Sequence, residues 1–149
     1  MESEADLRNV LRSLFAAQRL AVLGTHDGGQ PYSNLIAFVH TDNLKHLAFV
    51  TGRATRKYGN VLADGKVAVL VDDRKPDAVD FSDQVAVTAL GTAAEARGPE
   101  KEEITQLYLA KHPSLKDFVN SRSSALVSIR VSEYIVARFD SVQRVAAPD

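Results

Sequence analysis

The sequence of 149 residues contains no cysteine and no tryptophan. Without cysteine, the chain has no disulfide, no thiolate nucleophile and no cysteine-ligated zinc or iron–sulfur site. Its four histidines lack the paired spacing, with a carboxylate nearby, that metal sites use, so no metal is predicted. A Gly-x-Ser-x-Gly element is also absent, which removes the nucleophile turn found in many serine hydrolases.

Positive and negative charges are nearly balanced, since the formal net charge is −1 and the pI is near 6.4. Such a chain has no broad electropositive field, so neither nucleic acid nor an anionic membrane is an expected partner. Residues 1–6 are acidic and polar, unlike a secretory signal, and no apolar run approaches the length of a membrane span. We therefore expect a cytoplasmic protein with a single domain over residues 1–149.

Hydrophobic periodicity divides the chain into helices and strands. Apolar residues at helical spacing, with capping residues, predict helices at residues 4–18, 56–62, 98–112 and 115–120. Apolar runs bounded by turn residues predict strands at residues 20–25, 32–40, 45–51, 67–71, 85–96, 125–131 and 134–139. The charged segment 72–83 is predicted to be a loop, Gly91 to mark a bulge, and residues 146–149 to form a frayed tail.

Six or more short strands, mostly antiparallel and interrupted by helices, indicate a mainly β (α+β) fold. The expected architecture is a small β-barrel with flanking helices. A barrel of this size has too little interior for a flat tricyclic cofactor. A large ligand would lie outside it, most economically in a groove between two copies, which favours a homodimer.

A candidate phosphate site follows the apolar run Leu47–Val50, in the segment Thr51-Gly52-Arg53-Ala54-Thr55-Arg56-Lys57. Thr55 is placed to cap the next helix, whose first turn carries Arg56 and Lys57. A hydroxyl, two cations and the free N–H groups of a helix start therefore converge, which is the chemistry that binds phosphate. The motif by itself is equally compatible with a solvated basic turn in front of a helix.

The phosphate segment and its flanking strands resemble the pyridoxamine 5′-phosphate oxidase-like family, the flavin-binding split barrels, over residues 5–140. The phosphate signature of that family, Thr-x-x-x-Ser-Arg-Lys, takes the form here of Thr51 followed by Thr55-Arg56-Lys57. The only change is a conservative replacement of serine by threonine.

Three further stretches carry the same resemblance. Asn60–Val69 matches the family pattern of an asparagine, an acidic and a basic residue and a hydrophobic strand. Pro31–Phe38 occupies the place of the strand whose backbone lines the isoalloxazine ring. Gln84, just before a strand, is similar to the glutamine that reaches the flavin in the oxidases.

The resemblance implies a six-stranded antiparallel split β-barrel that forms a homodimer with FMN at its interface. The cofactor-binding residues that it implies are Asn34, Leu35, Ile36, Ala37, Val50, Thr51, Thr55, Arg56, Lys57 and Gln84. Since a flavin carries out the hydride chemistry itself, no side chain need be catalytic. The implied function is that of an FMN-dependent oxidoreductase whose substrate lies over the exposed face of the flavin.

The chain departs from the oxidases at the residues that would hold the substrate. The oxidases use a Tyr-x-x-x-Arg-Pro pattern for the substrate phosphate, whereas this chain has Tyr108 and then His112 in place of the arginine. It also lacks the C-terminal Trp-Arg and Arg-x-His element. These departures argue against pyridoxamine phosphate oxidation, and they leave Tyr108 and His112 as candidate contacts to another substrate.

Two alternatives keep the fold and change the function. The same barrel binds deazaflavin or haem in some relatives, and haem would require an axial histidine, for which His26, His40 or His112 is available. Alternatively, bound FMN serves electron transfer, storage or sensing in a non-enzymatic module. The sequence names neither the electron donor nor the acceptor.

Overall fold

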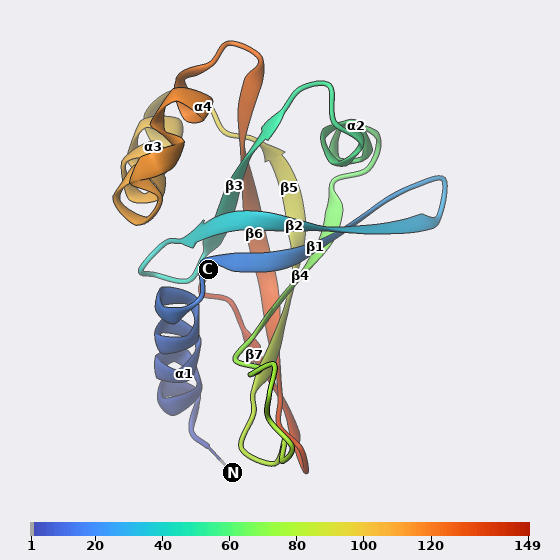
Figure 1. Cartoon of the computed structure of the whole chain (residues 1–149), viewed down its shortest axis with the longest axis vertical. Helices are drawn as coiled ribbons and strands as arrows, with labels where there is room; N and C mark the ends of the chain where they lie inside the picture. The colour runs from blue at the N-terminus through green and yellow to red at the C-terminus, as the bar shows by residue number, and fades with distance from the viewer. Residues whose placement is uncertain (1) are drawn as a thin grey trace.

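The computed structural model describes residues 2–149, which form a β-barrel with helices packed around it (Figure 1). The strands are β1 (Leu20–Asp27), β2 (Gln30–His40), β3 (His46–Gly52), β4 (Lys66–Asp72), β5 (Ala86–Glu95), β6 (Ser124–Ala137) and β7 (Val142–Ala146). The helices are α1 (Glu4–Ala17), α2 (Arg56–Ala63), α3 (Gly98–Lys111), the 3-10 helix η1 (Pro113–Leu115) and α4 (Lys116–Asn120). No helix among the described residues is long and apolar enough to cross a bilayer.

Six strands close the barrel, and each neighbouring pair is antiparallel. The hydrogen-bonded order is β3-β2-β1-β4-β5-β6, and β6 closes the ring by pairing with β3. β7 lies beyond this ring and pairs with the second half of β6. The six-stranded antiparallel barrel predicted from the sequence is confirmed, with β7 as an addition that the sequence pattern did not indicate.

The two strands predicted at residues 125–131 and 134–139 are one strand, β6. Its register with β5 shifts between Leu90 and Gly91, which pair with Glu133 and Val131, so Ser132 is an extra residue. This β-bulge changes which of the alternating residues face the core. The hydrophobic alternation is therefore interrupted, and the sequence predicted two strands in place of one. The bulge predicted at Gly91 is present, but the extra residue belongs to the opposite strand.

The end of the chain is also more ordered than expected. Ala146 is the last residue of β7, and the N–H of Ala147 donates to the carbonyl of Ser132 at 3.0 Å. The predicted frayed tail therefore begins inside a paired strand. The segment 73–85, in contrast, contains no helix or strand, as its charge and Pro76 predicted.

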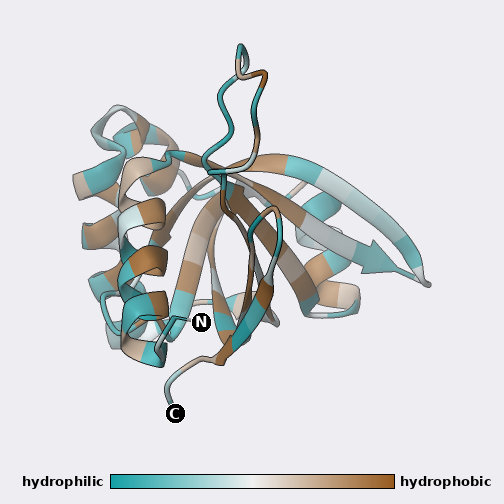
Figure 2. Ribbon diagram, turned by 90° about the horizontal axis from the view of Figure 1, so that it is seen from below, coloured by the Kyte–Doolittle hydropathy of each residue, from teal (hydrophilic) through white to brown (hydrophobic). Residues whose placement is uncertain are grey.

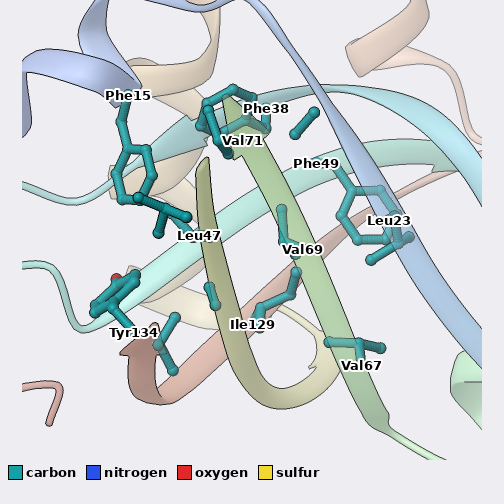
Figure 3. Close-up of a cluster of buried hydrophobic side chains, with 14 of the residues drawn as sticks. Phe15, Leu23, Phe38, Leu47, Phe49, Val67, Val69, Val71, Ile129 and Tyr134 are labelled. Atoms are coloured by element: carbon teal, nitrogen blue, oxygen red, sulfur yellow. The ribbon is translucent and has the colours of Figure 1, made fainter. Parts of the chain in front are cut away.

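Apolar side chains from the six strands of the ring and from α1 fill the interior of the barrel (Figure 3). Phe15 of α1 packs edge-on against Phe38, with ring centroids 6.0 Å apart, and also contacts Tyr134. The hydroxyl of Tyr134 donates to the carbonyl of Leu44 at 2.7 Å, so this buried polar atom is satisfied. Figure 2 shows hydrophobic residues gathered along the strands in the middle of the molecule. A large ligand must therefore bind outside the filled interior.

The barrel is split where β2 leaves β3. These strands pair only at Phe38–Phe49, Val39–Ala48 and His40–Leu47 among the described residues. From Gln30 to Ala37, β2 continues with β1, while β3 continues along β6 as far as Gly52. Figure 1 shows β2 and β3 running apart at this point, with α2 beside the opening. The edge of β2 that faces this opening is unpaired.

Replacement of Gly91 by alanine is expected to destabilise the barrel by about 1–3 kcal/mol, because the new methyl group overpacks a filled site. A Cβ at this position would collide with the carbonyl oxygen of Arg130. Urea denaturation followed by circular dichroism measures the change. Gly59→Ala is the control, since a Cβ there meets nothing within 4 Å, and alanine in a helix is expected to gain about 0.5–1 kcal/mol. A G91A protein as stable as the parent would contradict the bulge packing.

Candidate functional site

The turn between β3 and α2 has the cap geometry that the sequence predicts. Thr55 is the N-cap, and its Oγ1 accepts a hydrogen bond from the N–H of Tyr58 at 3.3 Å. The same hydroxyl donates to the carbonyl of Gly52 at 2.9 Å and lies 2.8 Å from Oγ1 of Thr51. Thr51 is 1% exposed, so a buried hydroxyl braces the cap. These contacts fix the direction in which α2 leaves the strand.

Two cations stand at the start of α2. The guanidinium of Arg56 lies over the ring of Tyr32 on β2, 4.6 Å from its centroid, and this residue is otherwise exposed. Lys57 is half-buried, and burial lowers the pKa of its ammonium group. The first N–H groups of a helix have no partner within it, and the helix dipole adds positive potential. This end of α2 is therefore suited to bind a phosphate group.

The third cation of the turn, Arg53, is committed to the protein itself. Its guanidinium forms two hydrogen bonds with the carboxylate of Glu95 on β5, at 2.6 and 2.8 Å. The hydroxyl of Tyr58 donates to the same carboxylate at 2.7 Å and lies 3.0 Å from the guanidinium. The hydrogen bonds from Arg53 hold the pKa of Glu95 at about 2. This network ties the first turn of α2 to the end of β5.

The loop before β6 is attached to the same turn. The backbone N–H of Arg53 donates to the carbonyl of Ser123 at 2.8 Å, and its Nε donates to the carbonyl of Arg122 at 3.4 Å. The polar loop 121–123 therefore adjoins the candidate phosphate site within one chain.

The structure brings the predicted ring-contacting residues to the split between β2 and β3. Asn34 and Ile36 point to the core side of β2, whereas Leu35 and Ala37 lie on its outer face, and Leu35 is 64% exposed. Because these four side chains alternate between two faces of the strand, only their backbone groups share one edge of β2. Oδ1 of Asn34 is buried and has no hydrogen-bond partner among the described residues. Such an atom favours a ligand that carries a donor.

Tyr108 lies at the point where the two strands separate. Its side chain is 1% exposed, and its hydroxyl donates to the carbonyl of Ala37 at 3.1 Å. Burial raises the pKa of this hydroxyl to about 12, against the opposing effect of a hydrogen bond with the backbone of Val50. One side chain from α3 therefore holds the backbone of both strands at the edge of the split.

His112, the second predicted substrate contact, is also directed into the protein. Its Nε2 lies 2.8 Å from the carbonyl of Phe38, and the residue is 7% exposed. Burial and bonding to β2 favour a structural role for both Tyr108 and His112, with α3 fastened across the outer face of the strand.

Gln84 is not brought near the other predicted residues within one chain. It precedes β5 beside the far end of β4, where Val85 donates to Oδ1 of Asp73 at 2.9 Å. β4 contains 7 residues, so at about 3.3 Å per residue its two ends are about 20 Å apart. Since α2 adjoins the opposite end of β4, the glutamine and the phosphate segment of one chain do not meet.

Glu95 and Tyr58 are the residues at this site that sequence reasoning missed. Both looked ordinary, one as the end of an alternating strand and the other as the apolar face of a short helix. The one signal in the sequence is a carboxylate at the end of a predicted strand, because a carboxylate that becomes buried there needs a cationic partner.

The model of the family described as "Pyridoxamine 5'-phosphate oxidase" matches residues 7–136. The chain belongs to this family. No curated protein matches the sequence.

Solved structures show the same fold at low sequence identity. The haem-binding protein from Mycobacterium smegmatis has a TM-score of 0.85 at 13% identity, covering 99% of this chain and 59% of that one. ChuZ from Campylobacter jejuni has a TM-score of 0.80 at 11% identity, covering 98% and 61%. General Stress Protein 26 from Bacillus anthracis has a TM-score of 0.71 at 20% identity, covering 93% and 98%. This chain thus spans about three fifths of the first two proteins and nearly all of the third.

Glu95→Gln is expected to remove a pH-dependent part of the stability. The pKa of Glu95 is lowered from 4.5 to about 2 in the folded chain, so its ion pair stabilises the fold above pH 4.5. That contribution is lost as the pH falls from 4.5 toward 2. Urea denaturation of both proteins across this range should give a free-energy difference that is constant above pH 5 and shrinks on acidification. A difference that does not change with pH would refute the assignment.

Proposed function

We propose that the chain is an FMN-binding flavoprotein, an oxidoreductase of still unnamed substrate, with the flavin held at the split between β2 and β3. The observation that carries the proposal is the start of α2. There a capped helix end, Arg56 and Lys57 are held in place by the Arg53–Glu95–Tyr58 network. A bound flavin would supply the hydride and electron transfer.

The residues around the split fit such a cofactor. Arg56, Lys57 and the N–H groups of the first helical turn would hold the phosphate. The unpaired edge of β2 and the end of β3 would offer backbone donors and acceptors to the polar edge of the ring, at Asn34–Ala37 and Val50–Thr51. Oδ1 of Asn34, which has no partner among the described residues, would accept a further hydrogen bond from the ring. No side chain is needed as an acid or base.

A homodimer would complete the site. Leu20, Leu35 and Leu70 are 55%, 64% and 36% exposed, and they lie together on the outer faces of β1, β2 and β4. Clustered exposed leucines are typical of a protein interface. Leu35 and Ala37 connect this face to the split, so a second copy packed here would cover the flavin. Gln84 would then approach a flavin only from the other copy.

Haem and deazaflavin are the rival cofactors, and the histidines do not favour haem. Nε2 of His26 pairs with Asp64 at 3.2 Å, and His112 bonds to the backbone of Phe38. His40 is half-buried against Phe15, with ring centroids 5.6 Å apart. None of these side chains lies on the split as an open axial ligand. The similarity to the haem-binding protein from Mycobacterium smegmatis, at 13% identity, concerns the fold alone.

The test of the cofactor begins with the absorbance spectrum of the protein purified without added flavin, followed by heat release and identification of any chromophore. We expect a flavin spectrum and released FMN. Arg56→Ala combined with Lys57→Ala should weaken FMN binding by about 10²–10⁴-fold, as two charge-assisted hydrogen bonds are lost. Isothermal titration of the stripped proteins measures this change.

Lys101→Ala combined with Lys116→Ala is the matched control, because it removes the same charge from exposed positions on α3 and α4. FMN bound equally well by the Arg56 and Lys57 variant would refute the phosphate site. A Soret band would identify haem as the bound cofactor, and a deazaflavin spectrum would identify deazaflavin; either result would refute FMN. If no reduced nicotinamide reduces the bound flavin, the result would support the non-enzymatic alternative.

The dimer is tested separately by Leu35→Glu. This residue is 64% exposed, so the fold should persist in circular dichroism, while a charge in an apolar interface should shift the protein from dimer to monomer. Analytical ultracentrifugation gives the mass. Leu62→Glu is the control, because Leu62 is 67% exposed on α2 and does not belong to the strand face that carries Leu20, Leu35 and Leu70. An L35E protein that remains dimeric would exclude this face as the interface.

A further inference from the structure

Besides the split between β2 and β3, a cleft lies on the side of the sheet opposite the filled core. It has a volume of about 410 Å³ and runs between the first turn of α3 and the outer faces of β3, β6 and β5. Figure 1 shows α3 beside this part of the sheet. Cavities of about 300–1,000 Å³ are the usual size for small-molecule sites. The cleft is lined by His46, Thr92, Ala94, Glu95, Ala96, Arg97, Glu100, Ser128 and Arg130.

Strand register explains the shape of this outer groove. Arg130 of β6 pairs with His46 on one side and Thr92 on the other, so these larger side chains form one end. Two residues along, Ser128 lies between Ala48 and Ala94. These small side chains leave a shallow floor, and Arg97 forms the other end, where α3 begins.

Ser128 in the floor is a buried polar group without a partner. The residue is 7% exposed, and its Oγ makes no hydrogen bond with any described residue. The alanines on the neighbouring strands offer it no side-chain donor or acceptor. A buried hydroxyl without a partner is unfavourable, and a polar ligand atom lying over the floor would relieve that cost.

The charges around the groove favour an anion. The guanidinium groups of Arg97 and Arg130 form no ion pair within residues 2–149. Of the two carboxylates, Glu95 is already paired with Arg53, which leaves Glu100 as the one carboxylate against the two arginines.

The start of α3 adds to this potential. Its N-cap, Arg97, makes no side-chain capping bond, and Pro99 carries no N–H, so the N–H groups of Gly98 and Glu100 are left for other acceptors. An anionic group seated between Arg97 and Arg130 would meet this helix end and the floor at the same time.

We propose that the outer groove binds a small organic anion, a carboxylate or phosphate ester of metabolite size, held by Arg97 and Arg130 with the hydroxyl of Ser128 beneath it. This site is separate from the split and does not depend on which cofactor occupies the split. Glu100, on the rim, selects against ligands that carry negative charge along their whole length.

Amide chemical-shift titration of the whole protein with two probes tests the proposal, with glutarate as the carboxylate and 3-phosphoglycerate as the phosphate ester. We expect saturable shifts that converge on residues 92–100 and 126–130 for at least one probe. Arg130→Gln and Arg97→Gln should each weaken that binding about tenfold, because each removes one charge-assisted hydrogen bond. Ser128→Ala should weaken it by a smaller factor.

Lys116→Gln is the control for the loss of one positive charge, since Lys116 is exposed on α4 outside the groove. Affinity for FMN, measured in parallel, should be the same in the Arg130 variant as in the parent protein. The proposal is overturned if neither probe produces saturable shifts at the groove, or if R130Q and K116Q bind the probes equally. If the parent protein does not bind FMN, that result would count against the proposed flavin site and not against the outer groove.

Discussion

The early separation of β2 from β3 is the constraint on which the candidate site depends. After three residue pairs, β2 stays with β1 and β3 stays with β6, so one barrel edge keeps its backbone donors and acceptors free. α2 begins where β3 ends, which places its positive end at the mouth of that opening. Tyr108 fixes the narrow end by bonding to Ala37. A closed barrel would have satisfied these backbone groups internally and left no reason for a polar ligand to bind there.

Features that depend on neighbouring residues were predictable from the sequence. The cap at Thr55 follows from a hydroxyl three residues before the helical N–H that it accepts. The loop 73–85 follows from charge and proline, and the order of the first strands follows from their short turns. The family and its fold were recognised because local patterns, the segment 51–57 among them, match that family, and the match over residues 7–136 confirms the family. The role of the segment 51–57 in binding phosphate stays a prediction.

Features that depend on distant residues were not predictable. Arg53 and Glu95 are separated by 42 positions, so nothing near either residue revealed that the third cation of the turn is used internally. The bulge at Ser132 changed the phase of alternation and made β6 resemble two strands. Tyr108 and His112 were assigned to a substrate by their place in a pattern, whereas burial and bonds to β2 are properties of the packed helix. The distance between Gln84 and the segment 51–57 within one chain follows from the length of β4.

The place of β6 in the ring has a consequence for the order in which the protein folds. Leu47 of β3 pairs with Ile129 of β6. β3 is synthesised early and β6 late, so the barrel cannot close until β6 has been made. Until then, the growing chain exposes the unpaired edge and the mostly apolar side chains of β3, and closure of the barrel carries the entropic cost of a long loop. A ribosome that stalls between residues 52 and 124 would therefore display an open, aggregation-prone sheet. The barrel therefore closes only when β6, in the C-terminal third of the chain, has been synthesised and pairs with β3.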